Sequence, residues 1–558
     1  MSDSNVIRVG ILSDSIHGSK YVHDLVGWMI SRSEFVVTHL ILHPAPQEIA
    51  PRNWPPRFIR SVRNFGLYAL ISGKLFNVLM AIERVRLSRD KNYSDHQKKY
   101  NLQELIRETL LLDPIVSSSG LSYRFAAADI NRIRSLGLDV LIRCGGGILR
   151  GDILSSSRLG VVSFHHADNR INRGVPAGFW EVYNRQSTTG FTLQRLSEEL
   201  DGGEVLLRGH FPTRHYYLLN QAALYEKSNH YLKLILGRIA SLGRLPPPIP
   251  SIPYSQRLFR QPTARQSLAY LGRSLGSMAA KKIRKIAGRD EKWQVSFLRS
   301  GWRNAVLRRG INIPNPPGGY LADPFVISRN GRDYCFVEDY DYSARRGRIS
   351  VYEIGAGGAE RLGIVLDEPF HLSFPYLFEY QGDLLMCPES SANRDVRLYR
   401  CVDFPLVWKL EATIMSDSSA VDSMLFERAG KWWLLTNVDP TNSGEYCSAL
   451  FAYSANSPLS TSWRPHAQNP VVLDASCARN AGLLFEDGKV FRVSQRQGFD
   501  RYGEGCQINE IVELTDDTYE ETCIAKIEPS FGDRVLATHH FHSRDDVTVF
   551  DYLVRSSL

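Results

Sequence analysis

The segment "GRDYCFVED", residues 331–339, decides the fold of the second half of the chain, because variants of it recur at a regular interval. Each copy is a glycine and a polar residue followed by a short apolar strand. The copies begin at Gly331, Gly382, Gly430 and Gly488, so they lie 51, 48 and 58 residues apart. Repeats near 50 residues that consist of short strands are typical of a β-propeller.

A second strand precedes the glycine of each repeat. These strands are "ADPFVIS" from residue 322, "SFPYLFE" from 373, "VDSMLFE" from 421 and "NAGLLFE" from 480. We predict an all-β propeller over residues 297–558, a length that fits five blades, with the last blade around "RVLATHHFHS" (534–543). His540 and His542 share a face of that strand, but two ligands without a nearby third predict no metal site.

Acidic residues in these strands are the candidate site of the propeller. The series "ADPF…FVED…PES…VDSMLF" resembles the propeller at the N-terminus of glucosamine inositolphosphorylceramide transferases and, more distantly, five-bladed glycoside hydrolases. The second resemblance implies that acidic residues of the innermost strands surround the axial channel. The candidates are Asp323, Glu338, Glu389 and Asp422, with Arg479 and Arg492 as anion-binding residues. Two carboxylates that flank a glycosidic bond could hydrolyse it; carbohydrate binding alone and a structural role between blades remain alternatives.

The first half of the chain alternates strands with helices. The segments "VIRVGILSD" (6–14), "FVVTHLILH" (35–43) and "LDVLIRC" (138–144) are short, apolar and rich in β-branched residues, as buried strands are. Helical patterns such as "YVHDLVGWMI" lie between them. Strands that alternate with helices imply a parallel sheet. We therefore predict a Rossmann-like α/β domain over residues 1–240.

A long insertion, residues 46–120, separates the second of these strands from the third. Its charge-poor middle is about as long as a membrane crossing, but Lys74 lies within it. We predict an amphipathic helix whose apolar face packs against the α/β core, with a position on a lipid surface as the alternative. The residues of that face, at helical spacing, are Leu67, Ile71, Leu75, Val78, Leu79 and Ile82.

Residues 241–296 are predicted to be a proline-rich linker followed by a basic helix. Five prolines fall within residues 246–253, a composition that excludes a helix. Residues 257–289 then carry nine Lys/Arg and no acid, and residues 52–99 carry eleven Lys/Arg and three acids. The rest of the chain is mildly acidic, which argues against a nucleic-acid binder. The two basic segments suit an anionic membrane surface or a phosphate-bearing substrate, or they are solvated helix faces.

The segment "VVSFHHADNRINRG", residues 161–174, concentrates polar side chains behind a predicted strand. Ser163 and His165 end the strand, Arg173-Gly174 ends the loop, and Asp201 follows in "LDGGEV". This order resembles the formyltransferase family that uses 10-formyltetrahydrofolate, over about residues 5–215. In that family a strand ends in Asn-x-His, a loop ends in Arg-Gly, and an Asp follows. The resemblance implies formyl transfer from 10-formyltetrahydrofolate to an amine.

The resemblance also assigns residues to roles. Asp201 would favour the imidazolium form of the catalytic His165, which then donates to the developing oxyanion or relays a proton. Ser163 replaces the family's asparagine as oxyanion donor and reaches less far, so Asn169 or a water could take its part. The loop "LIRCGGGIL" (141–149) resembles the folate-side loop. The expected cofactor-binding residues are Arg143, Cys144, Gly145, Gly146, Gly147, Ile148 and Leu149, and the expected substrate-binding residues of this half are His166, Asn169, Arg173, Gly174 and Trp180.

These observations predict an N-formyltransferase that acts on an amino sugar or glycan precursor and carries a carbohydrate-binding propeller. The co-substrate is 10-formyltetrahydrofolate, and no metal is required. Methionyl-tRNA is a less suitable acceptor, because family members that act on tRNA carry a small C-terminal β-barrel where this chain has a linker and a propeller. Two alternatives remain: a non-catalytic or drifted transferase that scaffolds a glycan pathway, and a bifunctional enzyme with glycoside hydrolase activity in the propeller.

The N-terminal segment and the cysteines predict where the protein works. The segment "MSDSNVIRVG" lacks the basic and apolar regions of a signal peptide. The eight cysteines are scattered without a C-x-x-C pair, which argues for reduced thiols and against a zinc site. We expect a cytoplasmic protein, with peripheral contact at the inner face of the membrane as a further option. The sequence leaves the oligomeric state open.

Overall fold

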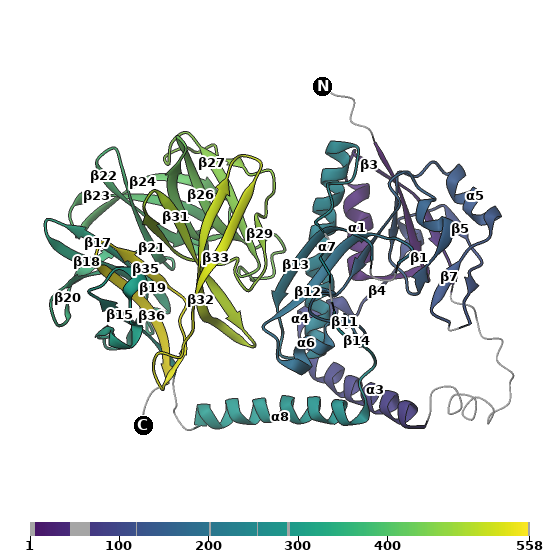
Figure 1. Ribbon diagram of the computed structural model, residues 1–558, viewed down its shortest axis with the longest axis horizontal. Helices are drawn as coiled ribbons and strands as arrows, with labels where there is room; N and C mark the ends of the chain where they lie inside the picture. The colour runs from purple at the N-terminus through teal and green to yellow at the C-terminus, as the bar shows by residue number, and fades with distance from the viewer. Residues whose placement is uncertain are drawn as a thin grey trace. The chain divides into compact units, whose positions relative to one another are not determined.

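The computed structural model describes residues 6–44, 67–118, 120–199, 202–250, 252–253, 255–286 and 291–555. Contacts divide the chain into two compact units, of which the first comprises residues 1–209 with 213–277 and the second residues 210–212 with 278–558. The first unit combines helices with a central sheet, whereas the second consists almost entirely of strands (Figure 1).

A seven-stranded sheet forms the centre of the first unit. In spatial order its strands are β13 (Glu204–Pro212), β12 (Thr188–Arg195), β10 (Val161–His165), β8 (Val140–Arg143), β1 (Ile7–Ser13), β3 (Phe35–Leu42) and β5 (Thr109–Leu111). The strands from β10 to β5 run parallel, and β12 joins β10 antiparallel. The three strands predicted from the sequence are therefore present as β1, β3 and β8.

Helices and short strand pairs surround this sheet. The helices are α1 (Lys20–Ile30), α3 (Leu67–Leu87), α4 (Lys91–His96), α5 (Ala127–Ser135), α6 (Phe179–Asn184), α7 (Tyr217–Leu242) and α8 (Ala264–Ile286). Ile130 and Ile133 of α5 pack on Leu12 of β1 and Leu141 of β8 in one apolar core. The short pairs are β2 (His17–Ser19) with β4 (Lys99–Asn101), β7 (Ser122–Arg124) with β6 (Ile115–Val116) and β9 (Ile148–Leu149), and β11 (Arg173–Gly174) with β14 (Leu258–Phe259).

Helix α3 is present where the sequence predicts an amphipathic helix, but it packs through another face. Phe76 lies at the centre of that face, with its ring 5.4 Å from that of Phe179 and 6.0 Å from that of Tyr217. An aromatic ring buries more apolar area than Ile or Val, so it decides which side packs. The predicted packing face is therefore wrong apart from Leu79, which is buried. The buried residues are Ser72, Phe76, Leu79, Met80, Glu83 and Leu87, whereas Leu67, Ile71, Val78 and Ile82 are exposed.

The predicted insertion and linker contribute structure to the first unit. Strand β5 lies within residues 46–120, yet it forms the edge of the main sheet beside β3. Residues 46–66 and 119 of the insertion lie outside the described residues. The basic helix predicted after the prolines is α8, and β14 lies just before it and pairs with β11.

Five sheets make up residues 291–555, as the repeats predict. Four of them follow one another along the chain: β17 (Gly319–Arg329), β18 (Arg332–Asp341), β19 (Arg346–Ile354) and β20 (Ala359–Leu366); β21 (Ser373–Tyr380), β22 (Asp383–Ser390), β23 (Asp395–Asp403) and β24 (Val407–Ser416); β25 (Ala420–Arg428), β26 (Lys431–Val438), β27 (Ala449–Ala455), β28 (Arg464–Pro465) and β29 (Val472–Leu473); β30 (Asn480–Glu486), β31 (Lys489–Gly498), β32 (Arg501–Leu514) and β33 (Tyr519–Ile527).

The fifth sheet joins both ends of the propeller sequence. It contains β15 (Glu291–Leu298), β16 (Ile311–Ile313), β34 (Val535–Ala537), β35 (Phe541–Arg544) and β36 (Val547–Arg555). β15 pairs antiparallel with β36 along its whole length. The propeller sheets therefore begin at Glu291, before the predicted residue 297, because a lone strand without the repeat's glycine turn completes the last blade.

The innermost strands β17, β21, β25, β30 and β35 contact one another in a closed ring. In the first three of them the pairing register breaks at the same place, and the residue there has a positive φ: 47° at Asp323, 47° at Phe374 and 50° at Asp422. A β-bulge re-aims the side chain that it carries. The repeated bulge thus gives Asp323 and Asp422 the same orientation in their blades.

Candidate functional site

Parallel strands end at one edge of the first unit's sheet, and polar residues gather there. Asp14 follows β1, His43 follows β3, and β8 and β10 end in Arg143 and His165. β1 lies between β3 and β8. The chain therefore continues from β1 to β3 on one side of it, and the later strand β8 lies on its other side. In open α/β sheets, ligands bind outside the carboxyl ends of the strands at such a switch point. This edge is the candidate site of the first unit.

The glycine turn after β8 folds over the end of β1. The N–H of Gly146 donates to Oδ2 of Asp14 over 3.1 Å. A Cβ on Gly145 would lie 2.9 Å from the backbone N of Asp14 and 3.2 Å from Nε2 of His43. Burial lowers the pKa of His43 to about 4, so its imidazole is neutral. Asp14 and His43 are not recognisable from the sequence, because one polar residue after a strand carries no signal of its own.

The other predicted cofactor-binding residues of this loop hold the turn in place. Gly147 has a φ of 78°, and a Cβ there would lie 2.1 Å from the ring of Tyr123, so only glycine fits. Ile148 and Leu149 form β9, which pairs with β7. Burial raises the pKa of Cys144 to about 12, which keeps its thiol protonated.

Arg143 and Ser163 are coupled at the ends of neighbouring strands. Nη1 of Arg143 donates to Oγ of Ser163 over 3.4 Å, and Oγ of Ser163 donates to the carbonyl oxygen of Phe164 over 3.0 Å. Ser163 is only 2% exposed. Its hydroxyl proton is therefore engaged by a backbone carbonyl, and the role of Ser163 as an oxyanion donor stays a prediction. Arg143, whose burial lowers the pKa of its guanidinium, is the cationic donor beside it.

The two adjacent histidines of this segment have different surroundings. His165 is half-buried at the end of β10, at the candidate site. The His166 ring stacks on Phe164 with a centroid distance of 5.0 Å and meets Tyr225 at 3.9 Å. Burial, and then the charges of His165, His96 and Arg143, lower the pKa of His166 well below its usual range, so it packs as a neutral ring. Asp201, the predicted partner of His165, lies outside the described residues.

The polar turn after the histidines is organised by Asp168, which has no assigned role in the sequence-based prediction. Its carboxylate accepts the N–H of Arg170 at 2.9 Å and pairs with the guanidinium of the same residue at 2.6 Å. Its carbonyl oxygen accepts the N–H of Asn172 at 2.9 Å. Asn169 lies within this turn. The Asp-x-Arg pattern alone could have suggested a local turn of this kind.

The Arg173-Gly174 pair packs against residues far along the chain. Together these residues form β11, which pairs with β14. Gly174 has a φ of 110°, and a Cβ on it would lie 2.0 Å from the carbonyl oxygen of Phe259, so glycine is required. Trp180 stacks on Phe259 at 4.6 Å and donates its indole N–H to the carbonyl oxygen of Val175 over 3.0 Å. Trp180 therefore belongs to the packed interior.

The second candidate site lies on the axis of the propeller. The five residues predicted there come together: Nε of Arg479 contacts Oδ2 of Asp422 at 2.6 Å, and the charges of the acidic residues act on one another. Glu389 accepts a hydrogen bond from Ser391 over 2.8 Å and, like Arg479, is only partly buried. The residues are Asp323 from β17, Glu338 from β18, Glu389 from β22, Asp422 from β25 and Arg479 from the loop before β30.

Burial determines the protonation of this cluster. It raises the pKa of Asp422 to about 7, and the nearby Glu389 adds to the shift while Arg479 opposes it. Burial and then the charges of Asp323 and Glu389 raise the pKa of Glu338 well above its usual range. Burial also raises the pKa of Asp323 to about 7; the charge of His539 opposes this shift and that of Asp551 adds to it. Burial therefore favours the protonated forms of Asp323, Glu338 and Asp422 more than water would.

His539 and Asp551 complete the cluster, and neither is predicted from the sequence. Nδ1 of His539 lies 2.9 Å from Oδ1 of Asp551, and its Nε2 lies 3.4 Å from Oδ1 of Asp323. Although burial alone would lower it, these carboxylates raise the pKa of His539. Ligand atoms of the three residues lie within 4.8 Å of one another, so they could hold a metal ion, but each already has a hydrogen-bonded or charged partner in the other two. The absence of a metal stays a prediction.

Three further residues of the propeller can be compared with the prediction. His540 and His542 do share a face, since both rings pack on Phe325 at 4.5 and 5.0 Å. Arg492 is completely buried, pairs with Glu521 at 2.5 Å and donates to the carbonyl oxygen of Cys477 over 2.7 Å. The predicted anion-binding role of Arg492 is therefore wrong: its donors already hold the fourth blade together.

Residues 306–536 match the family model described as the N-terminal part of glucosamine inositolphosphorylceramide transferase 1. The protein of that name from Arabidopsis thaliana is 37% identical over 210 residues, which cover 37% of this chain and 27% of the relative. The one from Oryza sativa subsp. japonica is 36% identical over 210 residues, covering 37% and 28%. The chain thus spans about a quarter of the length of these relatives.

Among solved structures, a family 117 glycoside hydrolase from Zobellia galactanivorans aligns with 12% identity and a TM-score of 0.32, covering 47% of this chain and 90% of that one. A GH62 α-L-arabinofuranosidase catalytic domain from Coprinopsis cinerea aligns with 12% identity and a TM-score of 0.33, covering 48% and 97%. Glycinamide ribonucleotide transformylase 1 from Symbiobacterium toebii aligns with 15% identity and a TM-score of 0.27, covering 43% and 90%. The sequence relationship that these comparisons establish is that of the propeller to the N-terminal part of the inositolphosphorylceramide transferases.

Proposed function

We propose that the chain is a glycan-modifying transferase. In this proposal the propeller binds the carbohydrate, and the first unit transfers a formyl group from 10-formyltetrahydrofolate to the amine of an amino sugar. The observation that carries it is the convergence of Asp14, Arg143 and His165 at the carboxyl edge of the parallel sheet. The name of the sequence relatives, which refers to glucosamine, supports an amino sugar as the acceptor.

The groups at this edge match the needs of formyl transfer. When the acceptor amine forms its bond to the formyl carbon, negative charge develops on the formyl oxygen, and Arg143 can donate to it. The bond from that carbon to the folate nitrogen then breaks, and the amine proton must reach the leaving nitrogen. His165 can carry this proton, since imidazole takes up and releases protons near neutral pH.

The residues present also fit the co-substrate that supplies the formyl group. A pterin ring offers a polar edge with both donors and acceptors. The glycine turn at Gly145 and Gly146 offers backbone groups, and Asp14 offers a carboxylate beside them. These residues would hold the ring, and Arg143 and His165 would face the transferred group.

Glycoside hydrolysis at the propeller axis is the second candidate function. It is favoured by the raised pKa values of Asp422 and Glu338, because a general acid must keep its proton at neutral pH while a second carboxylate is ionised. A chain that binds glycans without any turnover is the remaining alternative.

One incubation separates these functions. The protein is mixed with 10-formyltetrahydrofolate and a panel of amino-sugar nucleotides and glucosamine oligosaccharides, and products are followed by mass spectrometry. We expect a product that carries a formyl group in place of an amine hydrogen and appears only when co-substrate is present. Shorter oligosaccharides without added co-substrate would instead indicate hydrolysis. Glycan binding without either product would leave only the binding function.

A further inference from the structure

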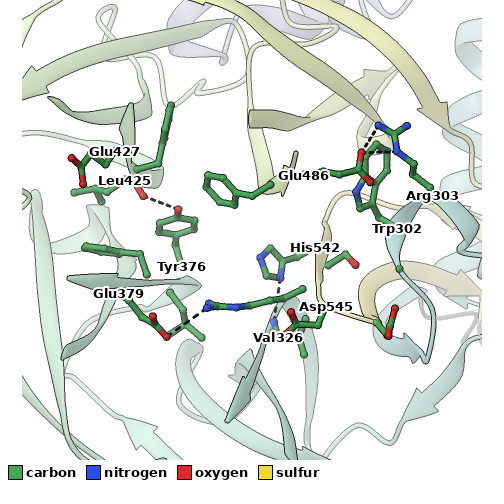
Figure 2. A pocket seen from close by; sticks show the side chains of 18 of the residues that line it. Trp302, Arg303, Val326, Tyr376, Glu379, Leu425, Glu427, Glu486, His542 and Asp545 are labelled. Carbon is green, nitrogen blue, oxygen red and sulfur yellow. Dashed lines mark hydrogen bonds and ion pairs between the residues drawn. The ribbon is translucent and has the colours of Figure 1, made fainter. Parts of the chain in front are cut away.

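The innermost strands of the propeller lead from the axial cluster to a second cavity. β17 carries both Asp323 and Val326, and β25 carries both Asp422 and Glu427. Val326 and Glu427 line a cavity of about 770 Å³ together with residues of the other blades (Figure 2). The same two strands therefore contribute residues to two candidate binding sites, the axial cluster and this cavity.

The same dipeptide, Phe-Glu, lines this cavity from three successive blades. It occurs as Phe378-Glu379 in β21, Phe426-Glu427 in β25 and Phe485-Glu486 in β30. Figure 2 shows the three glutamates set around the cavity. Because the repeat places each pair at the same position in its blade, glutamates of three different blades line one cavity.

The cavity is acidic even after its ion pairs are counted. Arg303 pairs with Glu486 at 2.5 Å, and Arg544 lies 3.5 Å from Glu379. Within the described ranges of the chain, the carboxylate of Glu427 has no ion-pair partner. Burial lowers the pKa of His542 to about 3, so this lining residue adds no positive charge. Asp545 and Asp546 add two more carboxylates to the lining.

An exposed aromatic ring lines the same cavity as Glu427. Phe485 is 56% exposed, and its ring centroid lies 6.5 Å from that of Phe426, the neighbour of Glu427. An aromatic face attracts both the apolar face of a sugar ring and a cation, and a carboxylate pairs with an ammonium group. A ligand that offers both features is a glycan with a free, protonated amine.

We propose that this cavity binds the unmodified amino-sugar glycan through its ammonium group, with Glu427 as the charged partner and Phe485 as the stacking ring. The inference rests on the proposed function and extends it. Acylation of the amine removes its charge, so the product is held more weakly than the acceptor. The propeller would thereby bind glycans that still carry a free amine in preference to glycans whose amine is acylated.

Isothermal titration calorimetry tests this site without any folate present. The probes are glucosamine oligosaccharides and the same oligosaccharides after N-acetylation. We expect the free amine form to bind at least about tenfold more tightly, and Glu427→Gln to remove most of that difference. Glu513→Gln, an exposed acid on the outer part of the fourth blade, is the matched control and should bind normally. Phe485→Ser should weaken both probes.

Equal binding of both probes, or unchanged binding by Glu427→Gln, would overturn this site. The outcome is independent of the proposed reaction. If the protein binds the free amine form more tightly but shows no formyl transfer, the proposed reaction is refuted and the proposed binding site is still supported.

A separate observation concerns the outer face of α3. Leu67, Ile71, Val78, Ile82 and Val85 are all more than half exposed, with Val85 at 75%. They lie three, four or seven residues apart and so form one stripe along the helix. At 100° per residue this stripe lies roughly opposite the face that carries Phe76 and Glu83, through which α3 packs. The helix therefore has a second apolar face that the described part of the chain leaves uncovered.

Helix α8 continues this surface. It lies beside α3, since the N–H of Ala264 donates to Oγ of Ser72 over 2.9 Å and the hydroxyl of Tyr270 donates to Glu83 (Figure 1). Its own exposed face carries Leu268 and Leu275. The two helices lie in the two basic segments, 52–99 and 257–289, of an otherwise acidic chain.

We infer that the exposed faces of α3 and α8 dock on an anionic lipid bilayer. Apolar side chains flanked by Lys and Arg on a helix are what an interfacial helix needs, and the cations match anionic headgroups. A second copy of this chain would bring the same positive charges together and is disfavoured. Among the helices that the structure describes, α3 included, none is both long enough and apolar enough to cross a membrane. This surface goes beyond the proposed function.

Vesicle sedimentation tests this surface with the full chain. We expect binding to vesicles of equal parts phosphatidylcholine and phosphatidylglycerol, release as salt rises, and little binding to phosphatidylcholine alone. The triple variant Ile71→Ser, Val78→Ser, Ile82→Ser should bind at least about tenfold less. The control variant Val402→Ser, Leu410→Ser, Val512→Ser changes equally exposed residues of the propeller and should bind normally. Normal vesicle binding by the α3 variant would overturn the inference. A variant that loses self-association, rather than vesicle binding, would overturn it as well.

Discussion

His165→Ala lowers formyl transfer to a verified amino-sugar acceptor by about two to four orders of magnitude, the usual contribution of a positioned acid–base group. The loss should appear in turnover more than in binding of 10-formyltetrahydrofolate, because the glycine turn at Gly145 and Gly146 and the carboxylate of Asp14 are unchanged. Single-turnover assays with mass-spectrometric detection, together with a binding titration of the co-substrate, measure both quantities.

Three further variants make this result specific. His17→Ala removes an exposed histidine of the same unit and should leave turnover unchanged. Arg143→Gln should also lose two to three orders of magnitude, since it removes the donor for the oxyanion. The double variant should be little worse than the poorer single one, as for residues that act as a unit. Wild-type turnover in His165→Ala would refute the proposed function of the first unit.

The propeller could be predicted from the sequence because its signals are local and repeated. The turn glycines 331, 382, 430 and 488 all have positive φ values, between 72° and 87°, which other residues adopt only with strain. The fifth blade is harder to define, because β15 and β36 come from opposite ends of the repeat region and neither carries that turn. The repeat alone therefore predicts an N-terminal boundary later than the start of β15.

The candidate sites could be predicted only in part, because contacts over long sequence distances decide them. The acids at Asp323 and Asp422 follow from a repeated motif, whereas His539 and Asp551 reach Asp323 from the last blade and share no motif with it. Arg143 and Ser163 are each recognisable in the sequence, but their mutual hydrogen bond depends on the pairing of β8 with β10.

Helix α3 shows a different limit of sequence patterns. It carries apolar residues on two faces, and helical spacing identifies both without telling which one packs. Phe76 and Glu83 determine which face packs. The carboxylate of Glu83 accepts the N–H of Leu218 over 2.7 Å at the start of α7. A residue pattern that ignores these partners selects the stripe with more β-branched residues, which is the exposed one.

Glu338→Gln is expected to stabilise the propeller increasingly as the pH rises. The folded state raises the pKa of Glu338 above its unfolded value near 4.5, so above that pH the folded protein binds a proton that the unfolded chain has lost. The free energy of unfolding therefore falls as pH rises, by about 1.4 kcal/mol per pH unit until the folded pKa is reached. Glutamine has the same shape and no titration, so this loss disappears.

Urea unfolding of the propeller at pH 5 and pH 8 measures the effect: the two proteins should differ little at pH 5, and the variant should be clearly more stable at pH 8. Asp341→Asn is the control of opposite sign. A hydrogen bond from Ser343 lowers the pKa of Asp341 to about 2, so its stabilisation is present above its unfolded value and lost only in acid. Parallel pH dependences of Glu338→Gln and wild type would contradict the burial of a titrating acid. If removal of the Glu338 carboxyl group stabilises the fold, that residue is retained for a reason other than stability. The axial carboxylates would then lie close together, despite their mutual repulsion, because they bind a ligand.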